Sequence, residues 1–132
     1  LFLAVTEDDA EHMVRVIAAG GLVQVMRDLL SGNEETEKAG WLGTQLEVAR
    51  RVRTDREFAE RWAKRSQAIS EATTERLARM QEAGIVRTDL PLEVVQRFIE
   101  LAHDGLVLHL AMGRPTTDLE PVLDLIEAAV RR

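Results

Sequence analysis

The sequence predicts an all-α fold, a bundle of five to six helices. Apolar residues recur at helical spacing in most segments, and no segment alternates apolar and polar residues for long, as a half-buried strand would. Glycine and proline gather in short clusters between these segments, where they mark turns. The chain has 132 residues, 45% of them hydrophobic, which suits one domain with its own core. We therefore expect residues 1–132 to form a single helical domain.

The first three helices are expected at about 1–19, 21–31 and 37–52. Gly20–Gly21 separates the first two, because glycine adopts backbone conformations that end or bend a helix. After the second helix, Gly32 suits the left-handed conformation that often follows a helix end.

A longer fourth helix is expected at about 55–83. Thr54 and Glu57 have the spacing of a capping box, in which a threonine and a glutamate satisfy each other's free backbone amides. Gly84 follows the last helical position and predicts the end of this helix.

The last two helices are expected at about 91–112 and 118–131. Asp89 is the candidate cap of the first, and Thr117-Asp118-Leu119-Glu120 is a second capping box.

Charge and composition exclude several classes of protein. The net charge is −6, so an extended phosphate-binding surface is not expected, and the basic run at 50–53 suits a helix C-terminus. No apolar run approaches the roughly 18 residues that cross a membrane, and the first residues lack the features of a signal peptide. The chain has no cysteine. We expect a cytoplasmic protein with no membrane contact and no DNA contact by this segment.

The last two helices are too apolar to be covered by one chain. Between Gly105 and Met112 the only polar side chain is His109, and the final helix has a wide apolar face. A helix that is apolar on all sides must be covered on all sides, so we expect a two-fold homodimer in which these helices form a four-helix bundle. The predicted interface residues are Gly105, Leu106, Leu110, Leu119, Val122, Leu125, Ile126 and Ala129.

Polar or large aromatic residues inside the apolar stripes have two interpretations. They are hydrogen-bonded or packed core residues, or they border a cavity and orient a ligand. The candidate ligand-binding residues are Met13, Trp41, Gln45, Trp62, Ser66, Thr73, Phe98 and His109.

One short stretch has the spacing of metal sites. Glu100 and His103 form a Glu-x-x-His motif, and His103 is followed by Asp104. A di-metal carboxylate bundle needs two such motifs and two further glutamates, and the nearest second candidate, Asp9 to His12, has aspartate in place of glutamate. A His-Asp phosphohydrolase needs an upstream histidine and a downstream aspartate, for which no local context is present. We therefore expect no metal, no cofactor and no enzyme activity.

Three stretches together resemble the C-terminal ligand-sensing and dimerisation domain of TetR-family transcriptional regulators. They are "LFLAVTEDD" at the start, "GWLGTQLEVARRVRTDREFAERW" in the middle and "GIVRTDLPLEVVQRFIELAHDGLVLHLAMG" near the end. The resemblance spans nearly the whole chain. Each stretch is a loose pattern, and the resemblance rests on the order and spacing of the three stretches.

This resemblance implies a homodimer through the last two helices and an effector pocket enclosed by the others. It also implies that the DNA-binding helix-turn-helix lies upstream of residue 1, and that the effector changes DNA binding, as in a repressor. Because few fixed charges are evident, the expected effector is small and largely hydrophobic. The alternative is a purely structural dimerisation module without a pocket, and a cavity near Trp41, Gln45, Trp62 and Ser66 would distinguish the two.

Overall fold

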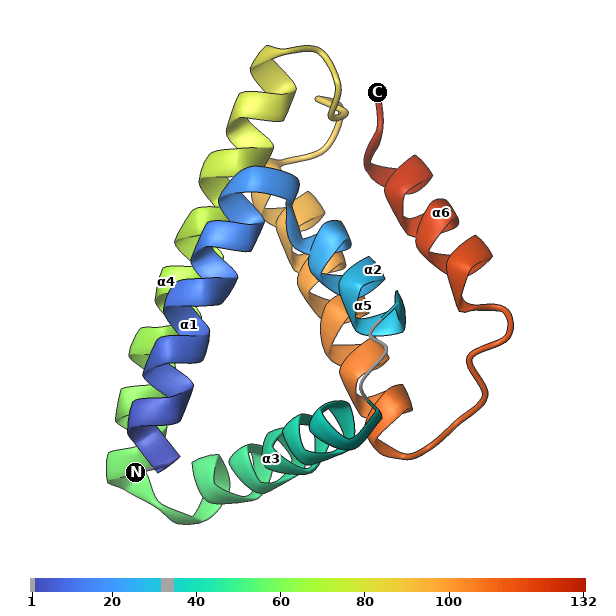
Figure 1. The fold of residues 1–132 in the computed structure, drawn as a ribbon. Helices are drawn as coiled ribbons and strands as arrows, with labels where there is room; N and C mark the ends of the chain where they lie inside the picture. The colour runs from blue at the N-terminus through green and yellow to red at the C-terminus, as the bar shows by residue number, and fades with distance from the viewer. Residues whose placement is uncertain (1, 32–34) are drawn as a thin grey trace.

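The computed structural model describes the backbone of residues 2–31 and 35–132 and the side chains of residues 11–31 and 42–132. Within these ranges the chain forms six helices and no strand (Figure 1). The helices are α1 (Phe2–Gly20), α2 (Leu22–Ser31), α3 (Glu35–Thr54), α4 (Arg56–Glu82), α5 (Leu92–Ala111) and α6 (Leu119–Val130). The predicted all-α class is confirmed. None of the described helices has the length and hydropathy needed to cross a membrane.

Glycine ends three of the helices, as local backbone preferences predict. Gly21 has φ +84° between α1 and α2, Gly84 has φ +76° after α4, and Gly113 has φ +68° after α5. Non-glycine residues rarely adopt this left-handed region. The suggested cap at Gly32 lies outside the described residues.

The predicted caps differ from the structure. Asp55, not Thr54, caps α4, because its carboxylate accepts a hydrogen bond from the Phe58 amide at 3.1 Å. The Thr54 hydroxyl instead donates to the Arg50 carbonyl at 3.2 Å, in the last turn of α3.

The caps of the last two helices also differ. Asp89 forms an ion pair with Arg87 at 2.6 Å, and Pro91 stands at the N-cap of α5. Asp118 begins α6 without a side-chain cap bond. A threonine or aspartate near a helix start has several available partners, and its spacing in the sequence does not choose among them.

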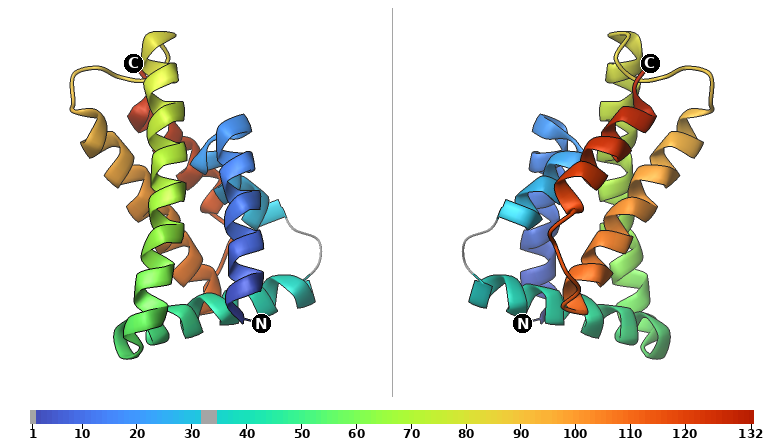
Figure 2. Two further views of the ribbon diagram at one scale, coloured as in Figure 1. Left: turned by 90° about the vertical axis from the view of Figure 1, so that its left-hand side faces the viewer. Right: turned by 90° about the vertical axis from the view of Figure 1, so that its right-hand side faces the viewer.

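The helices surround a core in which α2 has a central place. Helix α4 packs along α1, and α3 crosses the end of the bundle where α1 and α4 begin (Figures 1 and 2). Helix α2 packs against both α5 and α6, whereas α5 and α6 contact each other little. The largest fully buried side chains are Ile17, Met26 and Leu123, from α1, α2 and α6. The core therefore joins the first and last helices through α2.

The C-terminal residues are fastened to the loop between α4 and α5. The Arg87 amide donates to the Val130 carbonyl at 2.9 Å, and the Arg132 amide donates to the Ile85 carbonyl at 2.9 Å. These two bonds form an isolated antiparallel bridge between Val86 and Arg131. The end of α6 is thereby held next to the end of α4.

Candidate functional site

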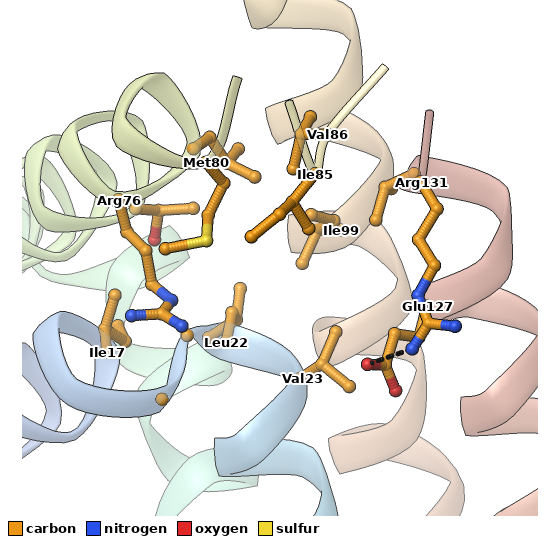
Figure 3. Close-up of a pocket in the computed structure, with 15 residues that line it drawn as sticks. Ile17, Leu22, Val23, Arg76, Met80, Ile85, Val86, Ile99, Glu127 and Arg131 are labelled. Atoms are coloured by element: carbon orange, nitrogen blue, oxygen red, sulfur yellow. Dashed lines mark hydrogen bonds and ion pairs between the residues drawn. The ribbon is translucent and has the colours of Figure 1, made fainter. Parts of the chain in front are cut away.

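A cavity of about 140 Å³ lies at the bend between α1 and α2, and we call it the elbow pocket (Figure 3). Its walls come from both sides of the bend, from the second half of α4, from the loop after α4, from α5 and from the end of α6. The lining residues are Ile17, Gly20, Gly21, Leu22, Val23, Thr73, Arg76, Leu77, Met80, Ile85, Val86, Ile99, Glu127, Val130 and Arg131. Most are apolar, so the pocket suits a ligand with an apolar part.

Arg76 forms one side of the elbow pocket and holds the end of α1. Its guanidinium donates to the carbonyls of Ala18 and Ala19, at 3.2 and 3.1 Å. A cation at this position is favourable because the last carbonyls of a helix carry partial negative charge. No ion pair joins Arg76 to an acidic side chain in the described part of the chain.

Gly21, which has a positive φ and no Cβ, leaves room for this close approach. A Cβ on Gly21 would lie 2.9 Å from Nε of Arg76 and 3.2 Å from its Cδ. The bend between the helices and the place of the arginine therefore depend on the same residue.

An ion-pair network lies on the opposite side of the pocket (Figure 3). Glu127 accepts hydrogen bonds from Arg131 at 2.9 Å and from Arg27 at 2.8 Å. These bonds hold the pKa of Glu127 below its ordinary value, with Arg27 the larger cause and Arg131 the next. Arg27 also reaches Glu120 at 3.0 Å and Asp124 at 2.9 Å, so one side chain of α2 binds three carboxylates of α6.

The lining of the elbow pocket has one uncompensated positive charge. Its charged residues are Arg76, Arg131 and Glu127, and Glu127 already pairs with Arg131. Arg76 remains as a cation without a carboxylate partner among the described residues. The pocket therefore combines apolar walls with a cationic group at one side.

A second cavity, of about 250 Å³, contains four of the predicted ligand-binding residues. We call it the Trp62 pocket. The predicted residues Met13, Gln45, Trp62 and Ser66 come together here from α1, α3 and α4. The full lining is Met13, Leu22, Gln45, Trp62, Arg65, Ser66, Ile69, Glu100, His103 and Asp104. The Trp41 side chain, also predicted, lies outside the described side chains.

The Trp62 pocket is more polar than the sequence predicted. The Arg65 guanidinium lies 4.3 Å from the Trp62 ring centroid, and its Nη2 is 3.4 Å from the Met13 sulfur. From α5, Glu100, His103 and Asp104 contribute a row of hydrogen-bond acceptors. The polar edge of α5 therefore faces this cavity as well as solvent.

The other three candidate ligand residues have different surroundings. Thr73 lines the elbow pocket, and its hydroxyl donates to the Ile69 carbonyl at 2.9 Å, so it is a satisfied core group. Nε2 of His109 donates to the Pro115 carbonyl at 2.8 Å and so fastens the segment between α5 and α6. Phe98 is 41% exposed on α5. His109 and Phe98 line neither of these two pockets.

The predicted interface residues divide into three groups. Gly105, Val122, Leu125 and Ala129 are exposed, and an added Cβ on Gly105 would meet no atom within 4 Å. Leu119 and Ile126 are half-buried. Leu106 and Leu110 belong to the core of their own chain, at 7% and 8% exposure, so their side chains are not available to a partner.

Other apolar residues of α5 are exposed in their place. Leu101, Leu108 and Met112 are 62%, 50% and 64% exposed, and they are not among the predicted interface residues. They share one stripe of α5 with Phe98 and Gly105. Leu106 and Leu110 lie on another side of the helix, roughly 120–160° around the helix axis from the centre of this stripe. A helix that is apolar on all sides does not indicate which side its own chain covers.

A six-helix, all-α fold is consistent with the C-terminal domain of a TetR-type transcriptional repressor. Residues 18–132 match the family described as "BetI-type transcriptional repressor, C-terminal". The chain belongs to this family, and it is the C-terminal domain of a TetR-family repressor. Members of the family are regulators and not enzymes.

Relatives match along the entire chain. The HTH-type transcriptional repressor Rv1474c of Mycobacterium tuberculosis is 42% identical over 132 residues, which are 100% of this chain and 69% of that protein. The HTH-type transcriptional repressor AcnR of Corynebacterium efficiens has the same identity and coverage. AcnR of Corynebacterium glutamicum is 40% identical over 132 residues, again 100% of this chain and 69% of the relative.

Proposed function

We propose that this domain senses a small effector in the elbow pocket and transmits its binding to a DNA-binding module that precedes it in a cytoplasmic homodimer. One observation carries this assignment: the elbow pocket is bounded by the end of α1 and the end of α6 together. Helix α1 would lead from the DNA-binding module, and α6 would belong to the dimer interface. A molecule between them contacts both elements that the response requires.

The response needs a ligand that prefers one arrangement of these helices. Binding shifts a conformational equilibrium only by the difference in affinity for the two states. Arg76 bonds the last carbonyls of α1 and also lines the pocket. A ligand that attracts this guanidinium would weaken the hydrogen bonds from Arg76 to the last carbonyls of α1, so that α1 changes its angle to α4.

The proposed effector is a small molecule with an apolar body and an acidic group. The apolar walls agree with the hydrophobic effector expected from the sequence, and Arg76 adds the preference for an anion. The volume of about 140 Å³ is close to that of an engineered apolar cavity that binds benzene. A substituted ring or a short chain therefore fits, and a large lipid does not.

The proposed dimer uses the exposed apolar residues of α5 and α6. These residues are Val94, Phe98, Leu101, Leu108, Met112, Val122 and Leu125, with Gly105 and Ala129 between them. Each large side chain that becomes fully buried contributes about 1.5–3 kcal/mol. Several such residues are needed, because association itself costs an estimated 4 kcal/mol or more.

Benzoate and its neutral analogue benzamide test the effector site in the full-length protein. We expect benzoate to raise the melting temperature by mass action and to lower the affinity for operator DNA in a gel-shift assay. The Arg76→Gln variant should lose most of the benzoate shift, and benzamide should give a smaller shift with either protein.

Arg79→Gln is the matched control, because Arg79 reaches the Ala18 carbonyl at 3.5 Å without lining the pocket. It should retain the benzoate shift. An equal shift in wild type and Arg76→Gln would exclude the arginine as the effector contact. If neither benzoate nor a wider panel of small acids changes stability or DNA binding, the purely structural dimerisation module becomes the better description.

A further inference from the structure

Two polar groups of α5 that line the Trp62 pocket have no partner among the described residues. The Glu100 carboxylate is half-buried, and no hydrogen bond or ion pair joins it to another described side chain. Removing an anion from water without a partner costs free energy. A ligand with a positive charge would compensate this carboxylate.

His103, three residues after Glu100 on α5, adds a second polar group without a partner among the described residues. Its Nδ1 lies 3.3 Å from a carboxylate oxygen of Asp104, and an ionised carboxylate only accepts. Nδ1 is therefore the donor in this contact, and Nε2 takes no part in it. Nε2 is buried and has no partner among the described residues. This nitrogen therefore lacks a hydrogen-bond partner among the described residues, as the Glu100 carboxylate does.

The one cation of the lining already has contacts. The Arg65 guanidinium lies on the Trp62 ring and against the Met13 sulfur. It comes from α4, whereas Glu100, His103 and Asp104 come from α5. The carboxylates of the lining, Glu100 and Asp104, outnumber its one guanidinium.

The apolar part of the lining requires an organic ligand. Met13, Leu22, Trp62 and Ile69 form the apolar part of the lining, and they come from α1, α2 and α4, whereas the carboxylates come from α5. Among the described residues no three histidine, aspartate or glutamate side chains come together as metal ligands would. A bare metal ion would leave the apolar wall without a contact.

We propose that the Trp62 pocket is a second ligand site, which binds a small organic cation such as an arylammonium or amidinium. The N–H groups of the cation donate to Glu100 and to the acceptors beside it, and its apolar body lies against Trp62 and Ile69. This charge preference is opposite to that of the elbow pocket. The two sites share one lining residue, Leu22 of α2.

Three probes of nearly equal shape test the charge preference: benzamidinium, benzamide and benzoate, with charges of +1, 0 and −1. Calorimetric titration of the full-length protein should show saturable binding of benzamidinium at millimolar concentration and weaker binding of benzamide. The Glu100→Gln variant should bind benzamidinium about tenfold more weakly, the usual effect of losing a charge-assisted hydrogen bond in a partly buried site.

Two controls separate this site from the surface and from the elbow pocket. Glu93→Gln removes an exposed carboxylate of the same helix that does not line the pocket, and it should leave benzamidinium affinity unchanged. Arg76→Gln should also leave it unchanged, whatever happens to benzoate. The second-site proposal can therefore fail or succeed independently of the proposed effector site.

Two results would overturn the proposal. One is the absence of saturable benzamidinium binding to a protein that is folded by circular dichroism. The other is equal benzamidinium affinity in wild type and Glu100→Gln. A parallel loss in Glu93→Gln would also count against it, because binding would then depend on overall negative charge.

Discussion

Two arginines connect helices that are distant in sequence. Arg27 of α2 binds three carboxylates of α6, and Arg76 of α4 binds the last carbonyls of α1. Isolated surface ion pairs contribute little to stability, but a network with shared partners contributes more. The Arg27 side chain is only 26% exposed, so solvent screens its pairs less than those of a fully exposed arginine. Both arginines act by fixing one helix against another.

Glu127 should make stability depend on acid pH. Its pKa is lowered from 4.5 in the folded chain, mainly by hydrogen bonds from Arg27 and Arg131. A lowered pKa stabilises the folded state above the unfolded pKa, and this contribution is lost as pH falls through the folded pKa. We expect Glu127→Gln to unfold at a lower urea concentration than wild type at neutral pH. The loss in the free energy of unfolding should be less than about 1 kcal/mol, because the group is partly exposed.

The difference in the free energy of unfolding between Glu127→Gln and wild type should become smaller as the pH falls below 4.5. Urea denaturation across this range measures it. Glu60→Gln is the control, because Glu60 is 68% exposed and 3.6 Å from its partner Arg56. It should follow the wild-type curve, and a constant offset between Glu127→Gln and wild type at all pH values would rule out the assigned ion pairs.

At the scale of the element, α4 shows how a helix start is chosen. Thr54 and Asp55 are adjacent, and either has a side-chain oxygen that suits an N-cap. Asp55 has extended backbone angles, φ −127° and ψ 108°, and accepts from the Phe58 amide. Thr54 is still part of α3. Because α3 extends through Thr54, the N-cap of α4 is Asp55, one residue after the position that the capping-box spacing predicted.

Two alanine variants compare the two candidate caps. Asp55→Ala should destabilise the domain by about 1 kcal/mol through loss of the cap. Thr54→Ala should have a smaller effect, because its hydroxyl only returns to a carbonyl of α3. Thermal unfolding of both variants measures the difference, and a larger loss from Thr54→Ala would favour the original capping box.

At the scale of the whole molecule, α5 has one apolar side that its own chain buries and another that is exposed. One side, with Val95, Ile99, Leu106 and Leu110, is buried in the chain's own core. The other side, with Leu101, Leu108 and Met112, is exposed. Contiguous exposed apolar residues on a soluble domain usually mark an interaction surface.

A single charged substitution tests the proposed dimer. Leu125 is 69% exposed on α6, and Leu125→Glu should dissociate the dimer, since an unpaired carboxylate in an apolar interface is costly. Light scattering after size-exclusion chromatography should then give the mass of a monomer. Leu46→Glu on α3, where the leucine is 43% exposed, should leave the dimer intact. A Leu125→Glu protein that remains dimeric would place the interface elsewhere.

The number of helices and their approximate positions followed from local chemistry, although the caps did not. Gly21, Gly84 and Gly113 adopt positive φ where the helices were expected to end. The sequence also predicted that α5 and α6 are too apolar for one chain to cover. Of the predicted interface residues, Gly105 and Leu125 are exposed, whereas Leu106 and Leu110 are buried in their own chain. Four of the residues proposed for a ligand, Met13, Gln45, Trp62 and Ser66, line one cavity.

Only the tertiary structure decided which side of each helix faces the core. Leu106 and Leu101 are both leucines of α5, and helical periodicity does not distinguish them; the packing of α2 and α4 against α5 buries the first and leaves the second exposed. The elbow pocket likewise has walls from α1, α2, α4, α5 and α6, which no local pattern joins. The physical reason is the sequence distance over which the interactions act. Helix formation and termination depend on residues within about one turn, whereas a pocket or a buried helix side depends on contacts between residues far apart in the chain.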